Sequence, residues 1–184
     1  MRIGKILLVG TAAVAAVGFA AAPAAAAPTD TTVVSFDIEA GTLDILAPAT
    51  ADIGGGPPGT DITGTIGPVT VTDSRASDDG SWVASVISTD FTTGAATPSE
   101  TILASEVEYW SGESTATTGD GTFEEGQTAA GDAEVLDNVV PVIAFTHTGG
   151  TGNNSATWNP SLIVHAPLDS QAGTYTGTVT HSVA

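Results

Sequence analysis

The sequence predicts an all-β fold, an immunoglobulin-like antiparallel β-sandwich. Short runs in which apolar and polar residues alternate recur along the chain, and a period of two is the pattern of a half-buried strand. Clusters of Gly, Pro and Asp separate these runs, and no run carries a helical apolar stripe. Many short strands with one wet face each are accommodated by two sheets that pack face to face.

Residues 1–26 have the composition of a secretory signal peptide. Arg2 and Lys5 precede an uncharged apolar stretch, residues 6–22, and small residues follow it. We place the cleavage after Ala26. Residues 27–184 are then expected to form a single β-sandwich domain that is secreted, stays extracellular or cell-wall associated, and has no membrane span.

The charge of the mature chain excludes several kinds of partner. All 21 acidic residues face one cation, Arg75, whereas nucleic-acid binding depends on Lys and Arg at phosphates. Anionic lipids and phosphate-rich wall polymers are repelled for the same reason. The classes of partner that the charge does not exclude are a neutral glycan, a peptide and a cationic protein. The chain contains no Cys, so it has no disulfide and no site for a lipid.

The first strands are expected at residues 34–39 and 43–45, with Gly41 as the break between them. Residues 69–73 and 82–87 are expected to form a hairpin, because the stretch between them is polar, acidic and contains Gly80.

The second half of the mature chain contains further alternating runs, each flanked by turn residues. Strands are expected at residues 101–104, 106–110, 138–146 and 162–166.

The last strand has the clearest alternation in the chain. One face carries Tyr175, Gly177, Val179, His181 and Val183, and the other carries only Thr and Ser. We expect the first face to pack in the core and the hydroxyl face to meet water.

The turn before this strand resembles the tyrosine corner of immunoglobulin-like domains. Gly173 precedes Tyr175 by two residues, and in such corners the Tyr hydroxyl binds the backbone of the turn. We therefore expect the hydroxyl of Tyr175 to hold this turn in place.

Two segments resemble WxL-domain cell-surface proteins of Gram-positive bacteria. The first is VTVTDSR at residues 69–75, followed by Gly80, Ser81 and Trp82; the second is ATWNP at residues 156–160, followed by the GTY turn at residues 173–175. The resemblance implies an extracellular, non-enzymatic domain that attaches to the cell wall, through its peptidoglycan.

The chain departs from the WxL pattern at two places. Ala84 stands where the first Trp-x-Leu motif has Leu, and His181-Ser182-Val183 replaces the second motif.

Trp82 and His181 each lie on the apolar face of an expected strand. For both residues a core position is the more common role, and contact with a glycan is the alternative for Trp82.

Trp110 is a different kind of candidate. In the run EVEYW at residues 106–110, Val107 and Tyr109 point to one face, whereas both Glu residues and Trp110 point to the other. An aromatic ring beside carboxylates can stack on a pyranose while the acids accept its hydroxyl protons. The alternative is that the Gly-rich loop after Trp110 covers it.

The sequence gives little support for a metal or for catalysis. His147, His165 and His181 show no metal-ligand spacing, and no Ser elbow or Cys nucleophile is present. The acidic turns at residues 78–80, 120–121 and 124–125 fit no calcium loop, and Asp-Gly pairs are ordinary turn chemistry. We expect no cofactor and no enzymatic activity.

The main functional prediction is non-covalent binding of cell-wall glycan or a surface protein. The alternative is a structural subunit of an extracellular layer or filament, since unpaired strand edges favour self-association. The candidate ligand-binding residues are Trp82, Trp110, Trp158, Tyr175 and His181.

Overall fold

The computed structural model describes residues 27–184, so the signal peptide and the cleavage at Ala26 lie outside the described residues. The chain divides into two units between Asp37 and Ile38. The described part of the first unit contains no helix or strand. The strand expected at residues 34–39 is therefore wrong, because no strand of the described chain pairs with this segment.

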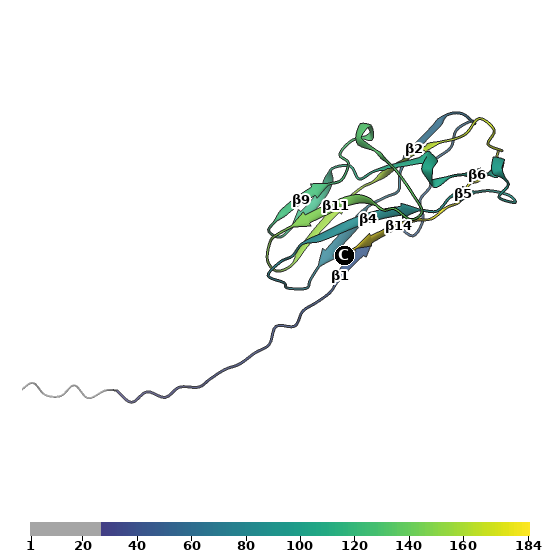
Figure 1. Ribbon diagram of the computed structural model, residues 1–184. Coiled ribbons are helices and arrows are strands. Elements are labelled where there is room, and N and C mark those ends of the chain that lie inside the picture. The colour runs from purple at the N-terminus through teal and green to yellow at the C-terminus, as the bar shows by residue number, and fades with distance from the viewer. Residues whose placement is uncertain (1–26) are drawn as a thin grey trace, which may run out of the picture. The chain divides into compact units, whose positions relative to one another are not determined.

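The first layer of the second unit consists of two four-stranded antiparallel sheets (Figure 1). One has the order β1 (Leu43–Leu46), β3 (Val69–Asp73), β12 (Asn154–Trp158) and β8 (Ser114–Thr118). The other has the order β10 (Glu134–Val135), β7 (Val107–Trp110), β13 (Ser161–His165) and β2 (Asp61–Thr65).

These two sheets are consecutive parts of one layer. The chain passes from β2 to β3, from β7 to β8 and from β12 to β13 within a few residues. Thr65 lies opposite Ser161, and Val69 lies opposite Trp158. Because Pro160 has no N–H to donate, the ladder is interrupted here and then resumes.

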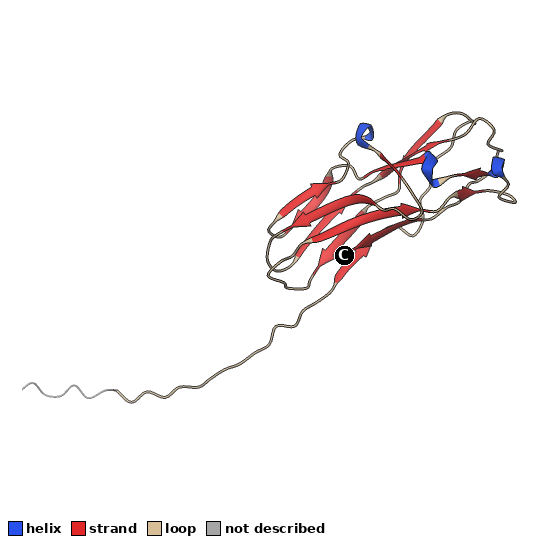
Figure 2. Ribbon diagram, in the orientation of Figure 1, coloured by secondary structure: helices blue, strands red, loops and turns tan. Residues whose placement is uncertain are grey.

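The second layer is the antiparallel sheet β14 (Val179–Val183), β4 (Trp82–Ser88), β11 (Val142–Thr148) and β9 (Thr122–Glu125). The short pair β5 (Phe91–Thr92) and β6 (Thr101–Ile102) extends it, and a bridge from Thr92 to Thr176 continues the pairing. Figure 2 shows how little of the unit is helical. The helical turns are η1 (Pro98–Glu100), η2 (Ala104–Glu106) and η3 (Ala130–Asp132).

The predicted all-β sandwich is confirmed, and its layers meet in an apolar core. This core includes Val69 and Val71 of β3 and Trp82 and Val86 of β4. No helix among the described residues is long and apolar enough to cross a membrane.

The hairpin expected between residues 69–73 and 82–87 is wrong. β3 belongs to the first layer and β4 to the second, so residues 74–81 carry the chain across the sandwich. The apolar faces of the two strands line the same core from opposite layers.

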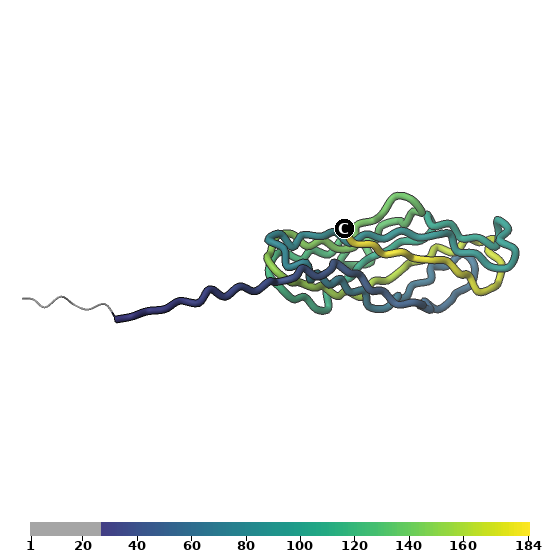
Figure 3. The backbone as a smooth tube through the Cα atoms, turned by 90° about the horizontal axis from the view of Figure 1, so that it is seen from below, coloured from purple at the N-terminus to yellow at the C-terminus, as the bar shows by residue number. Residues whose placement is uncertain are grey.

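The predicted alternation of inner and outer side chains is confirmed for the last strand, which comprises β14 and the residues just before it. Its Thr and Ser side chains are exposed, whereas Tyr175, Val179, His181 and Val183 are half-buried on the inner side. In Figure 3 this yellow segment runs beside the dark blue segment around β1, its neighbour in the other layer.

Candidate functional site

The outer face of β7, β13 and β2 gathers the polar side chains that the sequence places near Trp110. Val107 and Tyr109 are buried in the core, so the alternate residues Glu108 and Trp110 point outward. Both are half-buried. Ile163 lies opposite Glu108 on the neighbouring strand. The predicted division of this strand is confirmed for residues 107–110. It is wrong for Glu106, which ends the helical turn η2 and accepts a hydrogen bond from the backbone N–H of Leu103.

His165 joins the three strands on this face. Its Nδ1 lies 2.8 Å from an Asp61 carboxylate oxygen on β2, and its Nε2 lies 3.5 Å from one of Glu108 on β7. The hydrogen bond to Asp61 raises the pKa of His165, and the charge of Glu108 acts in the same direction. The imidazole therefore lies between the two carboxylates, whose remaining oxygens can serve as acceptors.

The dimensions of this face suit an extended polar ligand. Trp110 lies opposite Ser161, and His165 follows four residues later on the same strand, a distance of ~13 Å at the usual strand rise. An apolar ring at one end and a carboxylate–imidazole cluster at the other present a stacking surface and hydroxyl acceptors along one line. Arg75 does not contribute, because its guanidinium is bound to Asp73.

Trp82 and Trp158 are core residues. Trp82 is 2% exposed and Trp158 is fully buried. Phe145 lies between them, with ring-centroid distances of 5.9 Å to Trp82 and 5.0 Å to Trp158. The indole N–H of Trp82 binds the Asn154 side-chain oxygen at 2.7 Å. Their burial leaves neither ring face available to a surface glycan, so this stack supports the fold.

Tyr175 and His181 lie together at a different place, the inner side of the last strand. The Tyr175 hydroxyl lies 2.9 Å from the carbonyl oxygen of Gln171 and 3.1 Å from that of Ser99. These two contacts confirm the prediction that Tyr175 holds its turn in place. They also occupy its hydroxyl group.

A hydrogen-bonded chain links His181 to the core. The indole N–H of Trp158 donates to the Tyr109 hydroxyl at 3.0 Å, and this hydroxyl lies 3.3 Å from Nε2 of His181. Burial lowers the pKa of His181 to about 4.

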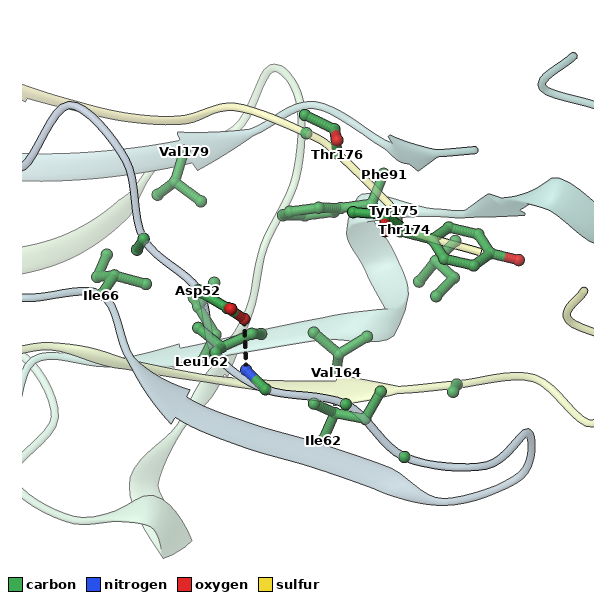
Figure 4. A pocket seen from close by; sticks show the side chains of 18 of the residues that line it. Asp52, Ile62, Ile66, Phe91, Leu162, Val164, Thr174, Tyr175, Thr176 and Val179 are labelled. Carbon is green, nitrogen blue, oxygen red and sulfur yellow. Dashed lines mark hydrogen bonds between the residues drawn. The ribbon is translucent and has the colours of Figure 1, made fainter. Parts of the chain in front are cut away.

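Tyr175 and His181 both line a cavity of about 1020 Å³ between the layers. Figure 4 shows the side chains of Ile62, Leu162 and Val164 on one side and those of Phe91 and Val179 on the other. Residues 47–58 pass along this cavity. No motif predicts it, because its walls come from segments far apart in the sequence.

The first WxL-like segment surrounds a buried polar network. Asp73 is 1% exposed and accepts two hydrogen bonds from the Arg75 side chain. Asn154 lies between Asp73 and Trp82, and Ser81 offers its carbonyl to Arg75. Sequence reasoning missed Asn154, and only its register opposite Asp73 in the sheet identifies it.

The described residues contain no group of three or more His, Asp or Glu that could hold a metal ion. Asp79 of the acidic loop binds the backbone N–H and the hydroxyl of Ser81, and these hydrogen bonds lower its pKa.

Neither a protein-family model nor a curated protein sequence matches this chain. The likeness to WxL domains therefore remains a prediction from the two short segments.

Proposed function

We propose that this protein is a secreted, non-enzymatic cell-surface protein that binds cell-wall glycan non-covalently, through the outer face of β7, β13 and β2. The observation that carries the proposal is the placement of Trp110 on the same outer face as Glu108, His165 and Asp61. A sheet face suits a long, hydrated polymer, because such a chain can lie across it without entering a pocket. The WxL-like segments support a location at the cell wall.

The charges of the chain favour a neutral glycan over a phosphate-bearing polymer. The one basic side chain beyond residue 26, Arg75, is bound to Asp73. On the proposed face, Asp61 and Glu108 flank His165. Sugar hydroxyls can donate to these carboxylates, whereas a phosphate would meet like charge.

The experiment is a pull-down on purified peptidoglycan, with and without calcium. Trp110→Ala removes the stacking surface and should lose most of the retention shown by the unaltered protein. Val83→Ala is the matched control, because Val83 is an exposed apolar residue on the outer face of the other layer. Retention no better than that of an unrelated acidic protein would remove the proposal, and loss only in the absence of calcium would show a bridging cation.

A further inference from the structure

The cavity between the two layers is too large to be a packing defect. Its volume is about 1020 Å³, whereas few voids in protein interiors are larger than a water molecule. Binding sites for small molecules have volumes of roughly 300–1,000 Å³ and are lined mainly by apolar side chains. The size of this cavity is therefore that of a large ligand site.

Both layers contribute apolar side chains to the walls of the cavity (Figure 4). Ile62 and Leu162 come from β2 and β13 of the first layer, and Phe91 and Val179 come from β5 and β14 of the second. Leu162 is 2% exposed, whereas the other three side chains are half-buried. The cavity therefore has an apolar interior that solvent reaches from one side.

Residues 47–58 line a further part of the cavity. Ile53 packs against the core, and a Cβ at Gly64 of β2 would lie 2.8 Å from the Cβ of Ile53, so Gly64 makes room for this segment. Among the described residues, no backbone–backbone hydrogen bond joins residues 47–58 to another part of the chain. Apolar packing holds the segment in place, and we expect it to move aside when a ligand enters.

His181 brings one accessible polar atom to this apolar cavity. Its ring lines the cavity, and Nε2 lies 3.3 Å from the Tyr109 hydroxyl. Nδ1 has no hydrogen-bond partner among the described residues and is not one of their fully buried unpaired atoms, so a ligand can reach it. Burial lowers the pKa of His181 to about 4, which leaves the ring uncharged at neutral pH. A hydroxyl group both donates and accepts, so it can pair with Nδ1 in either tautomer.

The charges at the cavity disfavour a charged ligand. Asp52 is the one charged side chain among the lining residues, it is exposed, and it accepts a hydrogen bond from the backbone N–H of Gly54 at 2.9 Å (Figure 4). An anionic ligand would meet this carboxylate and the strong negative charge of the whole chain. Any ionic group would also lose its hydration between the apolar walls.

We propose that this cavity binds one uncharged lipid, whose alkyl chain lies between the two apolar walls and whose hydroxyl group binds Nδ1 of His181. Burial of the chain supplies the affinity, and each buried CH₂ group contributes roughly fourfold. The inference does not depend on glycan binding. Leu162 and Val164 of β13 line the cavity, whereas Ile163 and His165 of the same strand lie on the outer face.

Displacement of the uncharged fluorescent probe N-phenylnaphthylamine by hexanol, octanol and decanol measures binding to the cavity. Affinity should rise with chain length, by roughly sixteenfold from octanol to decanol, because two CH₂ groups are added. Decanoate, which has a charged head group at neutral pH, should bind about tenfold more weakly than decanol or worse. No displacement by decanol, or equal affinity for decanoate, would overturn the proposal.

A variant that fills the cavity identifies the site. Val179→Trp places an indole between the walls and should weaken decanol binding by about tenfold or more, through the loss of buried CH₂ groups; Val179→Phe replaces it if the larger side chain prevents folding. Val83→Trp is the matched control, because Val83 is 40% exposed on the outer face of β4. If decanol binds equally to the two variants, the cavity is not the site.

The place of the hydroxyl group is tested with His181→Leu, which keeps the wall apolar and removes the hydrogen bond. Decanol affinity should fall by about twofold to tenfold, the contribution of one neutral hydrogen bond. Circular dichroism and thermal melting show that the variant is folded. Unchanged affinity of the folded variant would overturn the assignment of His181 as the partner of the hydroxyl group.

The chain itself offers one other apolar occupant, residues 33–39. Val34, Phe36 and Ile38 in this segment are 80%, 82% and 81% exposed. The double variant Phe36→Asp/Ile38→Asp should bind decanol as tightly as the unaltered protein does. If only the double variant bound decanol, the segment would fill the cavity and the lipid proposal would be wrong.

Discussion

The guanidinium of Arg75 binds both carboxylate oxygens of Asp73, with Nε 2.9 Å from Oδ1 and Nη2 2.8 Å from Oδ2. Arg75 also donates to the carbonyl of Ser81, at the point where the chain enters β4. This side chain therefore connects the end of β3 in one layer with the start of β4 in the other. The hydrogen bonds and charge of Arg75 hold the pKa of Asp73 below its usual value.

Removal of this guanidinium should destabilise the sandwich. Arg75→Ala leaves a buried carboxylate with only Asn154 as a hydrogen-bond donor from a side chain, and we expect it to lower the free energy of unfolding by about 1–3 kcal/mol. Loss of one partner of a fully buried pair costs about 3–5 kcal/mol, and the partial exposure of Arg75 reduces this. Urea denaturation measures the change. A difference below about 0.5 kcal/mol would show that Asp73 finds other partners.

His181 should make stability fall in mild acid. Burial lowers its pKa to about 4 from the usual 6.5. Between these two pH values the unfolded chain binds a proton at this residue and the folded protein does not. Its contribution is complete above about pH 6.5 and is lost as the pH falls toward 4, on the order of 3 kcal/mol in total. Melting temperatures of the parent and of His181→Gln should converge over this range.

His165 provides an internal comparison of opposite sign. Its pKa is raised by Asp61 and Glu108, so its contribution is present at low pH and is lost as the pH rises through the raised value. His165→Gln should therefore reduce stability at acidic pH more than at alkaline pH. The same direction of change for both His variants would contradict the assignment of one to the core and the other to the outer face.

Salt should stabilise the folded protein. All 21 acidic residues lie beyond residue 26 with Arg75 as the one Lys or Arg, and their repulsion in the compact state is screened over ~10 Å at 0.1 M salt. We expect the melting temperature to rise as NaCl is added at low ionic strength. A flat or falling response would show that the carboxylates are too far apart to repel effectively.

The sequence predicts the faces of strands better than their partners. The last strand and residues 107–110 have their inner and outer sides as expected, because parity is local information. The layer change between β3 and β4 depends on the packing of Trp82 against residues distant in sequence, such as Phe145 and His147. Local turn chemistry at residues 74–81 gives no information on this packing.

For the candidate site residues too, the sequence predicts the face of a strand better than its neighbours. Trp110 was separated from the core by the alternation of its own strand, whereas the burial of Trp158 is decided by strands on both sides of it. His165 and Asp61 join Trp110 only through the register of β13 with β2. The strand expected at residues 34–39 has the right pattern, but pattern alone does not supply a neighbour for its backbone.

Binding of soluble glycan strands from peptidoglycan, measured by isothermal titration calorimetry, tests the proposed function most directly. The unaltered protein should give saturable binding, and Trp110→Ala should weaken it by about tenfold, through the loss of one stacking contact. Trp158→Phe, a change in the core, should lower stability yet leave the affinity of the folded protein unchanged. Equal affinity of Trp110→Ala and the parent, or no binding by the parent, would contradict the assignment of this face as the glycan site.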